Sequence, residues 1–425
     1  MSALKIKYFV FGSRDPNTGA AKKMFSQVSE LNRLGLDTEL VWVSMEDFHF
    51  PYYDFLTLHR VDRVLIGDYL GRIKRARKIS KIFGEVIDSL ESDDILYCRY
   101  NSLPLYYPHQ YFRRLRSCKI VTEHQTKELD ESKLVGNTLA FWSDYIFGKL
   151  LRKQSDAIVG VTNEITHHEI ARAGDSEKHH TTIGNGFVVR SAPLRRAPQY
   201  NNDLSLLCVA SMINHWHGFD RLLQGLAAYN GMPRVVIHVV GGEPGLPHLQ
   251  KLASDLGITD RVIFHGFLTG EFFDALFDQC HIAVGSLGIH RKGLTQTSEL
   301  KAREYCARGI PYIIACADPD FPTDFPYILR LPADESPIDI EQVLAFAEEV
   351  CADPDHPQKM RRYAEEHLDW SVKMAKLKEF LEALVGEGAG IPEPGPASPG
   401  DDGPEVPKGA TLPGPIATRV PGKGE

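Results

Sequence analysis

Residues 281–314, HIAVGSLGIHRKGLTQTSELKAREYCARGIPYII, decide which fold the chain is expected to adopt. An apolar strand leads into a long loop, and a helix is expected to begin near Thr297 or Ser298, because both are good N-caps. Gly309 marks the end of that helix, and Pro311 precedes a second apolar strand. A strand, a helix and a strand in this order predict a parallel βαβ unit.

The same alternation fills most of the chain. Most of the expected strands are almost continuously apolar, as is typical of parallel strands that helices cover on both faces. Helical stretches such as residues 19–34, 218–229, 246–256 and 270–277 separate them. The pattern predicts an α/β fold with doubly wound sheets. The expected strands are residues 5–11, 39–43, 95–98, 119–123, 157–162, 205–210, 235–240, 262–264, 282–284 and 312–315.

These units are too numerous for one doubly wound sheet. Residues 189–203, VRSAPLRRAPQYNND, are polar and lack periodicity, so a linker is expected there. We predict two Rossmann-like domains that face each other across a cleft, which is where ligands of such folds bind. The expected parts are residues 1–189, a linker at 190–203, a second domain at 204–355, helices at 356–385 and a disordered Gly/Pro-rich tail at 386–425.

Composition narrows the classes of function. The chain has 425 residues with 48 Lys and Arg against 56 Asp and Glu, so its net charge is −8 and a nucleic-acid partner is not expected. The seven cysteines are scattered and form no C-x-x-C pair. A disulfide framework is therefore not expected. We expect the cysteines to be free thiols in a reducing cytoplasm.

Positive charge gathers beside the helix in residues 281–314. Arg291 and Lys292 precede it, and a helix N-terminus with two cations suits a di-anion such as a pyrophosphate. Lys301 and Glu304 share one face of the helix, where a surface salt bridge is the alternative. Near the N-terminus, Gly19 opens a helix and permits close approach by a ligand, although a simple tight turn is an equal alternative.

A family resemblance rests on residues 304–313, EYCARGIPYI. They resemble the donor-site helix of GT-B-fold glycosyltransferases of the family-4 type, in which a Glu is followed by Gly and then by a Pro-containing strand. The H-R-K-G loop and the L-K-x-R-E-Y helix are similar to a capsule and exopolysaccharide variant. Further landmarks in the family's order are TEH at 122–124, TIGNG at 182–186, LCVAS at 207–211, HGFD at 217–220, VVGGEP at 239–244 and DRVIFHG at 260–266.

The resemblance implies roles for single residues. Glu304 would accept hydrogen bonds from the ribose hydroxyls, and Gly241 would lie at the donor. His124 would face the cleft and contact the transferred sugar, with a structural histidine as the alternative.

Three positions depart from the family pattern. The donor-binding Arg and Lys fall near Ser211 and His217, and the first Glu of the E-x7-E motif falls at Gln296, whose amide can still bind a sugar hydroxyl. In this variant, positive charge toward the phosphates would come from Arg291, Lys292 and Lys301.

The resemblance implies that the last helix of residues 356–385 crosses back to the first domain. It also implies a retaining hexosyltransferase that needs no metal ion or cofactor. It would move a sugar from a nucleotide diphosphate sugar to a saccharide or lipid-linked acceptor in surface polysaccharide synthesis. D-x-D strings at 318–320 and 353–355 are typical of turns, and histidine pairs at 167–168 and 179–180 lack the spacing of a zinc site. The alternatives are a nucleotide-sugar epimerase on the same fold and a non-catalytic nucleotide-sugar-binding protein.

One basic helix suggests a location. From Arg72 to Lys81 six cations fall within ten residues, while Ile73, Ala76 and Ile79 recur at helical spacing. Such a helix could rest on the anionic inner face of the cell membrane, which would make the protein peripheral. A solvated basic face is the alternative.

Overall fold

The computed structural model describes residues 4–12, 18–46, 52–64, 68–104, 106–112, 116–199 and 203–386. The chain divides into two units, residues 1–386 and residues 387–425, and the description below concerns the first. All of the predicted tail except Gly386 lies outside the described residues.

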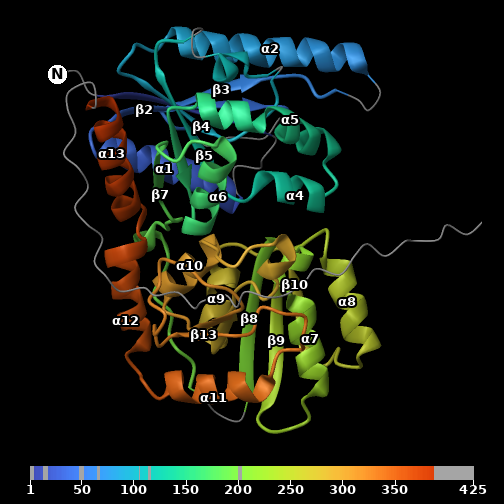
Figure 1. Ribbon diagram of the computed structural model, residues 1–425. Coiled ribbons are helices and arrows are strands. Elements are labelled where there is room, and N and C mark those ends of the chain that lie inside the picture. Colours follow the sequence, from blue (N-terminus) through green and yellow to red (C-terminus); the bar gives the residue numbers. More distant parts are fainter. Residues whose placement is uncertain are drawn as a thin grey trace, which may run out of the picture. The chain divides into compact units, whose positions relative to one another are not determined.

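Two sheets form the framework of this unit (Figure 1). The first has seven strands in the order β3-β2-β1-β4-β5-β6-β7, and the second has six in the order β10-β9-β8-β11-β12-β13. All neighbouring strands in the described residues pair in parallel. The prediction of two Rossmann-like, doubly wound sheets is therefore confirmed.

The strands are β1 (Lys5–Phe11), β2 (Asp37–Ser44), β3 (Leu56–Arg60), β4 (Ile95–Arg99), β5 (Lys119–His124), β6 (Ala157–Gly160), β7 (His179–Thr182), β8 (Asp203–Met212), β9 (Arg234–Gly242), β10 (Val262–Gly266), β11 (Ile282–Val284), β12 (Tyr312–Ile314) and β13 (Ile328–Arg330).

The first sheet carries α1 (Gly19–Arg33), α2 (Tyr69–Asp88), α3 (Pro108–Tyr111), α4 (Glu128–Leu134), α5 (Thr138–Gln154) and α6 (Asn163–Ala173). The second carries α7 (Phe219–Ala228), α8 (Leu246–Asp255), α9 (Glu271–Gln279), α10 (Leu300–Arg308), α11 (Ile340–Cys351) and α12 (His356–Tyr363). Short turns are η2 (Val189–Ser191), η3 (His215–His217), η4 (Ile289–Lys292) and the π-helical η5 (Ala364–Leu368), and α13 (Trp370–Gly386) follows. We call the two sheets with these helices the first and second lobes.

The strands in the middle of each sheet are buried because both of their faces are covered. β6 (AIVG) and β11 (IAV) are buried along their whole length. In the first lobe, α1 covers one face through Met24 and Val28, and α2 covers the other through Ile79 and Phe83. These runs are the ones that the apolar pattern predicted as strands.

Three strands were not predicted, and all of them lie at sheet edges. They are β3, β7 and β13. β7 has the sequence HHTT, and its two histidines are exposed, so it carries no apolar signal. An edge strand is covered less than a central one, and its sequence is correspondingly more polar.

The last helix belongs to the core of the first lobe. Trp370, Met374 and Leu377 of α13 are buried in the same cluster as Met24 and Val28 of α1. Figure 1 shows α13, in red, beside α1 and the first sheet. The C-terminal segment thus returns from the second lobe to the first.

The start of α10 differs from the prediction. Its N-cap is Glu299, and neither Thr297 nor Ser298 caps it. The Ser298 hydroxyl instead accepts a hydrogen bond from the backbone N–H of Asn185 at 2.7 Å. The predicted end is correct, because Gly309 adopts a left-handed conformation there.

Candidate functional site

The loops at the carboxyl ends of β8, β9 and β11 approach one another closely. Gly241 has a φ of +148°, and a Cβ atom there would lie 1.9 Å from the carbonyl oxygen of Ala210. Gly218 has a φ of +67°, and its Cβ atom would lie 2.6 Å from the nitrogen of Gly288. Both positions therefore require glycine. Ligands of doubly wound folds bind at this end of a sheet.

His217 is a neutral group at this end of the sheet. Its Nδ1 atom accepts a hydrogen bond from the backbone N–H of Asn214 at 3.0 Å, and its ring stacks on Phe219. Burial and the nearby charge of Lys301 hold the pKa of His217 well below its usual value. His217 therefore supplies no positive charge near pH 7, as the sequence indicated.

Lys301 carries positive charge to the same place. Its Nζ atom lies 5.2 Å from the ring centroid of Phe219, on which His217 also stacks. The atom is buried and has no hydrogen-bond partner among the described residues, and Oε2 of Glu299 lies 3.8 Å away. A buried ammonium without hydrogen bonds is costly, so this position suits an anionic ligand.

The two cations of η4 are already paired. Arg291 donates to both carboxylate oxygens of Asp220 at 2.9 and 2.8 Å and also binds Glu335, whose pKa it lowers to about 2. Lys292 binds Glu131 at 2.9 Å and lies over the ring of Trp216. A phosphate would have to displace these carboxylates, and the phosphate role of both cations stays a prediction.

Gln296 belongs to a contact between the lobes, which we call the Glu164 seam. The carboxylate of Glu164, in the first turn of α6, accepts hydrogen bonds from the N–H groups of Thr295 and Gln296, both at 2.8 Å. Lys127 donates to Glu164 at 2.6 Å and to the carbonyl oxygen of Gly293 at 3.1 Å. Burial acts to raise the pKa of Glu164, but Lys127 and these N–H groups outweigh it and lower the pKa.

The remaining predicted donor-side residues are dispersed. Ser211 is exposed near the end of β8. Glu304 accepts a hydrogen bond from Arg308 at 2.9 Å. This contact is a salt bridge within the helix, which is the kind of interaction that the sequence analysis gave as the alternative to a role at the donor. A Cβ atom on Gly19 would lie 3.3 Å from Cδ1 of Leu300, so the start of α1 contacts the start of α10. The structure therefore brings together Lys301 and His217, and it places Gly19 against the same helix.

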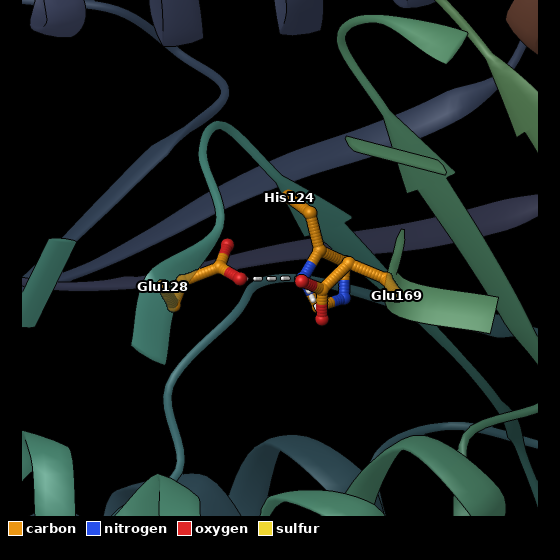
Figure 2. Close-up of side chains that lie close together, drawn as sticks. All are labelled: His124, Glu128 and Glu169. Carbon is orange, nitrogen blue, oxygen red and sulfur yellow. Dashed lines mark hydrogen bonds and ion pairs between the residues drawn. The ribbon is translucent and has the colours of Figure 1, made fainter. Parts of the chain in front are cut away.

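His124 lies inside the first lobe. It is fully buried at the end of β5, and its ring nitrogens contact Glu128 at 3.0 Å and Thr122 at 3.1 Å. Glu169 of α6 lies 3.4 Å from Nδ1 (Figure 2). Both ring nitrogens of His124 therefore bind protein groups, as in the structural alternative, and its contact with the transferred sugar stays a prediction.

The polar cluster around His124 was missed by the sequence analysis. Arg152 is fully buried, donates to Glu169 and to Asp144, and lies 3.7 Å from Glu128. These residues come from α4, α5 and α6, and no local spacing links them. The only sequence signal is that Glu128 follows His124 by four residues.

Burial sets the protonation of this cluster. It raises the pKa of Glu128 to about 8 and that of Glu169 to about 7, and it lowers the pKa of His124 to about 4. The ligand atoms of these three residues lie within 4.8 Å of one another, so they could hold a metal ion. The guanidinium of Arg152 already binds the same Glu169 oxygen that faces His124, and its charge opposes a second cation there.

The aspartates of the 318–320 string hold the lobes together. Asp318 and Asp320 both accept hydrogen bonds from the buried guanidinium of Arg303. Asp320 also binds Lys373 of α13, and Nε of Arg303 donates to the carbonyl oxygen of Asn185 at 3.0 Å. The string therefore forms a structural ion-pair network.

Comparisons with known proteins agree with this architecture. Residues 203–323 match the protein family described as glycosyl transferases group 1. A sucrose-phosphate synthase from Thermosynechococcus elongatus has a TM-score of 0.68 and 12% identity over 90% of this chain and 100% of its own. WaaG, a glycosyltransferase involved in lipopolysaccharide biosynthesis, has a TM-score of 0.63 and 12% identity, and the match covers 90% of this chain and 100% of WaaG. HepE of Anabaena, in complex with UDP-glucose, has a TM-score of 0.63 and 14% identity, and the match covers 89% of this chain and 100% of HepE.

No curated protein matches the sequence. The second lobe carries a glycosyltransferase group 1 domain, and the two lobes share the GT-B fold of glycosyltransferases. No helix in the described part of the chain combines the length and apolar character needed to cross a bilayer.

Proposed function

We propose that the protein is a retaining glycosyltransferase that moves a sugar from a nucleotide diphosphate sugar to a saccharide or lipid-linked acceptor and needs no metal ion or other cofactor. The group 1 domain and the UDP-glucose complex of HepE support the class of donor. A role in surface polysaccharide synthesis, at the cytoplasmic face of the cell membrane, is part of the proposal and is supported by the likeness to WaaG.

The buried ammonium of Lys301 is the observation that carries this proposal. It lies at the start of α10, where the free N–H groups of the helix favour negative charge. Departure of a nucleoside diphosphate places negative charge on the leaving phosphate. A preorganised donor at such a position typically stabilises the transition state by about 3 kcal/mol. Lys301 would therefore do at the leaving phosphate what a divalent cation does in metal-dependent transfer.

A non-catalytic nucleotide-sugar-binding protein is the second candidate. The pairing of Arg291 with Asp220 and Glu335 and the use of Gln296 in the Glu164 seam favour it, because they occupy groups assigned to the donor. Such a protein would bind a nucleotide diphosphate and release none from any donor sugar. An epimerase would convert the donor without an acceptor.

A panel of nucleotide sugars separates these functions. The protein is incubated with UDP-, GDP-, ADP- and dTDP-sugars, with and without a membrane extract as the source of acceptor, and with and without EDTA. Acceptor-dependent release of nucleotide that EDTA leaves unchanged is expected. Binding without release would favour the second candidate, an isomerised donor would indicate an epimerase, and loss of release in EDTA would contradict metal independence.

The anomeric configuration of the product tests retention directly. Nuclear magnetic resonance of the purified product should show the same anomeric configuration as the donor sugar. The opposite configuration would contradict the proposed stereochemistry while leaving transferase activity intact.

A further inference from the structure

Helix α5 turns its polar side toward the protein. Its buried residues are Ser143, Asp144, Gly148, Leu151 and Arg152. Asp144 and Arg152 form an ion pair of 2.8 Å inside the lobe. A surface helix ordinarily buries its apolar stripe and exposes its polar one, so α5 is inverted.

The outward side of α5 is apolar. Leu139 is 65% exposed, Trp142 55%, Tyr145 63% and Ile146 61%. Exposed Leu150 lies further along α5, and two more exposed apolar residues come from the end of α4, which packs against α5. We call this surface the α4–α5 apolar face: Leu134, Val135, Leu139, Trp142, Tyr145, Ile146 and Leu150. A contiguous apolar patch that includes Trp and Tyr marks a binding surface.

Lysines border this face, although the start of α4 is acidic and its Asp130 is exposed. Lys133, Lys149 and Lys153 are exposed on α4 and α5. α2 covers one face of the first sheet, the ring of His109 in α3 lies beside Phe83 of α2, and α3 contacts α5. These three helices form one layer. The exposed cations of α2 are Arg72, Lys74, Arg77, Lys78 and Lys81. The chain as a whole has a net charge of −8, so this layer is a local exception.

We infer that the α4–α5 apolar face inserts into the interface of an anionic lipid bilayer, while the cations of α2 bind its headgroups. Apolar and aromatic side chains bordered by Lys and Arg suit this interface, where each cation near an anionic surface adds to the attraction. A second copy of the chain is a poorer occupant, because self-association through this layer would bring cations toward cations. The inference deepens the membrane location in the proposed function, but adhesion requires no sugar donor, so vesicle binding can be tested independently of sugar transfer.

The position of the face also suits the proposed function. α4 begins at Glu128, beside His124, and it contacts η4 of the second lobe through the ion pair of Glu131 and Lys292. A lipid-linked acceptor would then enter one helix away from the proposed donor site. This last step rests on the proposed function, whereas bilayer binding itself does not.

Vesicle sedimentation tests the inference with the full chain. Phosphatidylcholine vesicles with phosphatidylglycerol should pellet the protein, and phosphatidylcholine alone should pellet much less. The triple variant Leu139→Ser, Trp142→Ser and Ile146→Ser should bind about tenfold more weakly or worse. The control variant Met232→Ser, Phe267→Ser and Phe272→Ser removes comparably exposed apolar residues from the second lobe and should bind like the wild type.

The fluorescence emission of Trp142 provides a second measurement of membrane insertion, with Trp142→Phe as a conservative variant. Trp142 is exposed, whereas Trp42 and Trp370 are buried and Trp216 is half-buried. A blue shift of emission on addition of anionic vesicles is expected, and Trp142→Phe should remove most of it while pelleting is retained.

Charge is tested separately from apolar contact. The variant Arg72→Gln, Lys74→Gln and Lys78→Gln should weaken binding to anionic vesicles and reduce its dependence on salt. Equal pelleting of the serine triple variant and the wild type would overturn the inference, as would no pelleting of the wild type. A dimer in analytical ultracentrifugation that the serine triple variant loses, together with no vesicle binding, would identify a second copy as the occupant and also overturn it.

Discussion

Glu164 and Gln296 are joined by two hydrogen bonds that run in opposite directions. The N–H of Glu164 donates to Oε1 of Gln296 at 3.1 Å, and the N–H of Gln296 donates to Oε2 of Glu164 at 2.8 Å. The two residues stand on different lobes. The amide that the sequence assigns to a sugar hydroxyl therefore contributes to the contact between the lobes, and a donor sugar would compete with Glu164 for it.

Substitution of Glu164 should loosen this contact. Glu164→Ala leaves the N–H groups of Thr295 and Gln296 without their acceptor, so we expect the free energy of unfolding to fall by about 1–2 kcal/mol. Urea unfolding measures the change. Glu177→Ala, an exposed residue of the same lobe, is the control and should have no effect. Equal stability of the two variants would show that the seam contributes nothing.

Replacement of Lys301 should separate binding from stability. Lys301→Met removes a buried ammonium that lacks a hydrogen-bond partner in the described structure but lies 3.8 Å from the carboxylate of Glu299, so the stability of the ligand-free protein should change by no more than about 1 kcal/mol. Affinity for a nucleoside diphosphate, measured by calorimetry, should fall about tenfold or more.

The control for Lys301 is Lys251→Ala on the exposed side of α8. It should change neither the affinity nor the stability. A Lys301→Met variant that binds the nucleotide as tightly as the wild type would remove the phosphate role of this residue.

Arg291 and Lys292 should behave differently from each other. Arg291→Ala breaks two ion pairs that tie η4 to Asp220 and Glu335, so unfolding should become easier by about 1 kcal/mol. Lys292→Ala breaks one ion pair and should affect nucleotide affinity more than stability. Thermal unfolding and calorimetry on both single variants test this, and an identical pattern in the two would contradict it.

The stability of the protein should decrease as the pH rises past neutral. Burial raises the pKa of Glu128 to about 8, which is above the value of an exposed Glu. The folded protein then keeps a proton that the unfolded chain has released, so this stabilisation is present at low pH and is lost as the pH rises through about 8. His124, with a pKa lowered to about 4, has the opposite effect, but only below about pH 6.5.

A comparison of variants isolates this effect. Between about pH 6.5 and pH 9 the wild type should lose about 1–2 kcal/mol more than Glu128→Gln, which has no proton to release. Asp130→Asn, on the same helix, should keep the wild-type dependence. Parallel pH profiles for the wild type and Glu128→Gln would refute the raised pKa.

Much of the fold could be predicted because the signal was local. A run such as IAV at Ile282–Val284 is apolar at every position, since parallel strands in the middle of a sheet are covered on both faces. The end of α10 was equally readable, since Gly309 adopts a conformation that other residues avoid. The start of α10 could not be predicted in this way, because the Ser298 hydroxyl binds Asn185 of the other lobe and does not cap the helix.

The candidate site was predicted less well, because its contacts join residues that are far apart in the sequence. The sequence identified the charge of Lys301 and the neutrality of His217, both of which follow from residue type and near neighbours. It could not show that Arg291 is bound by Glu335, which lies far along the chain. Nor could it show that His124 is enclosed by Glu169 and Arg152.

The sequence by itself determined the alternation of strands and helices, which predicts doubly wound sheets, because the position of each element depends on the short-range spacing of apolar residues. Only the tertiary structure decided which charged groups are hydrogen-bonded. Ion pairs form between side chains that the fold brings within a few ångströms, whatever their separation in sequence. Arg291 acquires Asp220 and Glu335 in this way, while Lys301 lies at the end of the sheet with Glu299 at 3.8 Å and no hydrogen bond in the described structure.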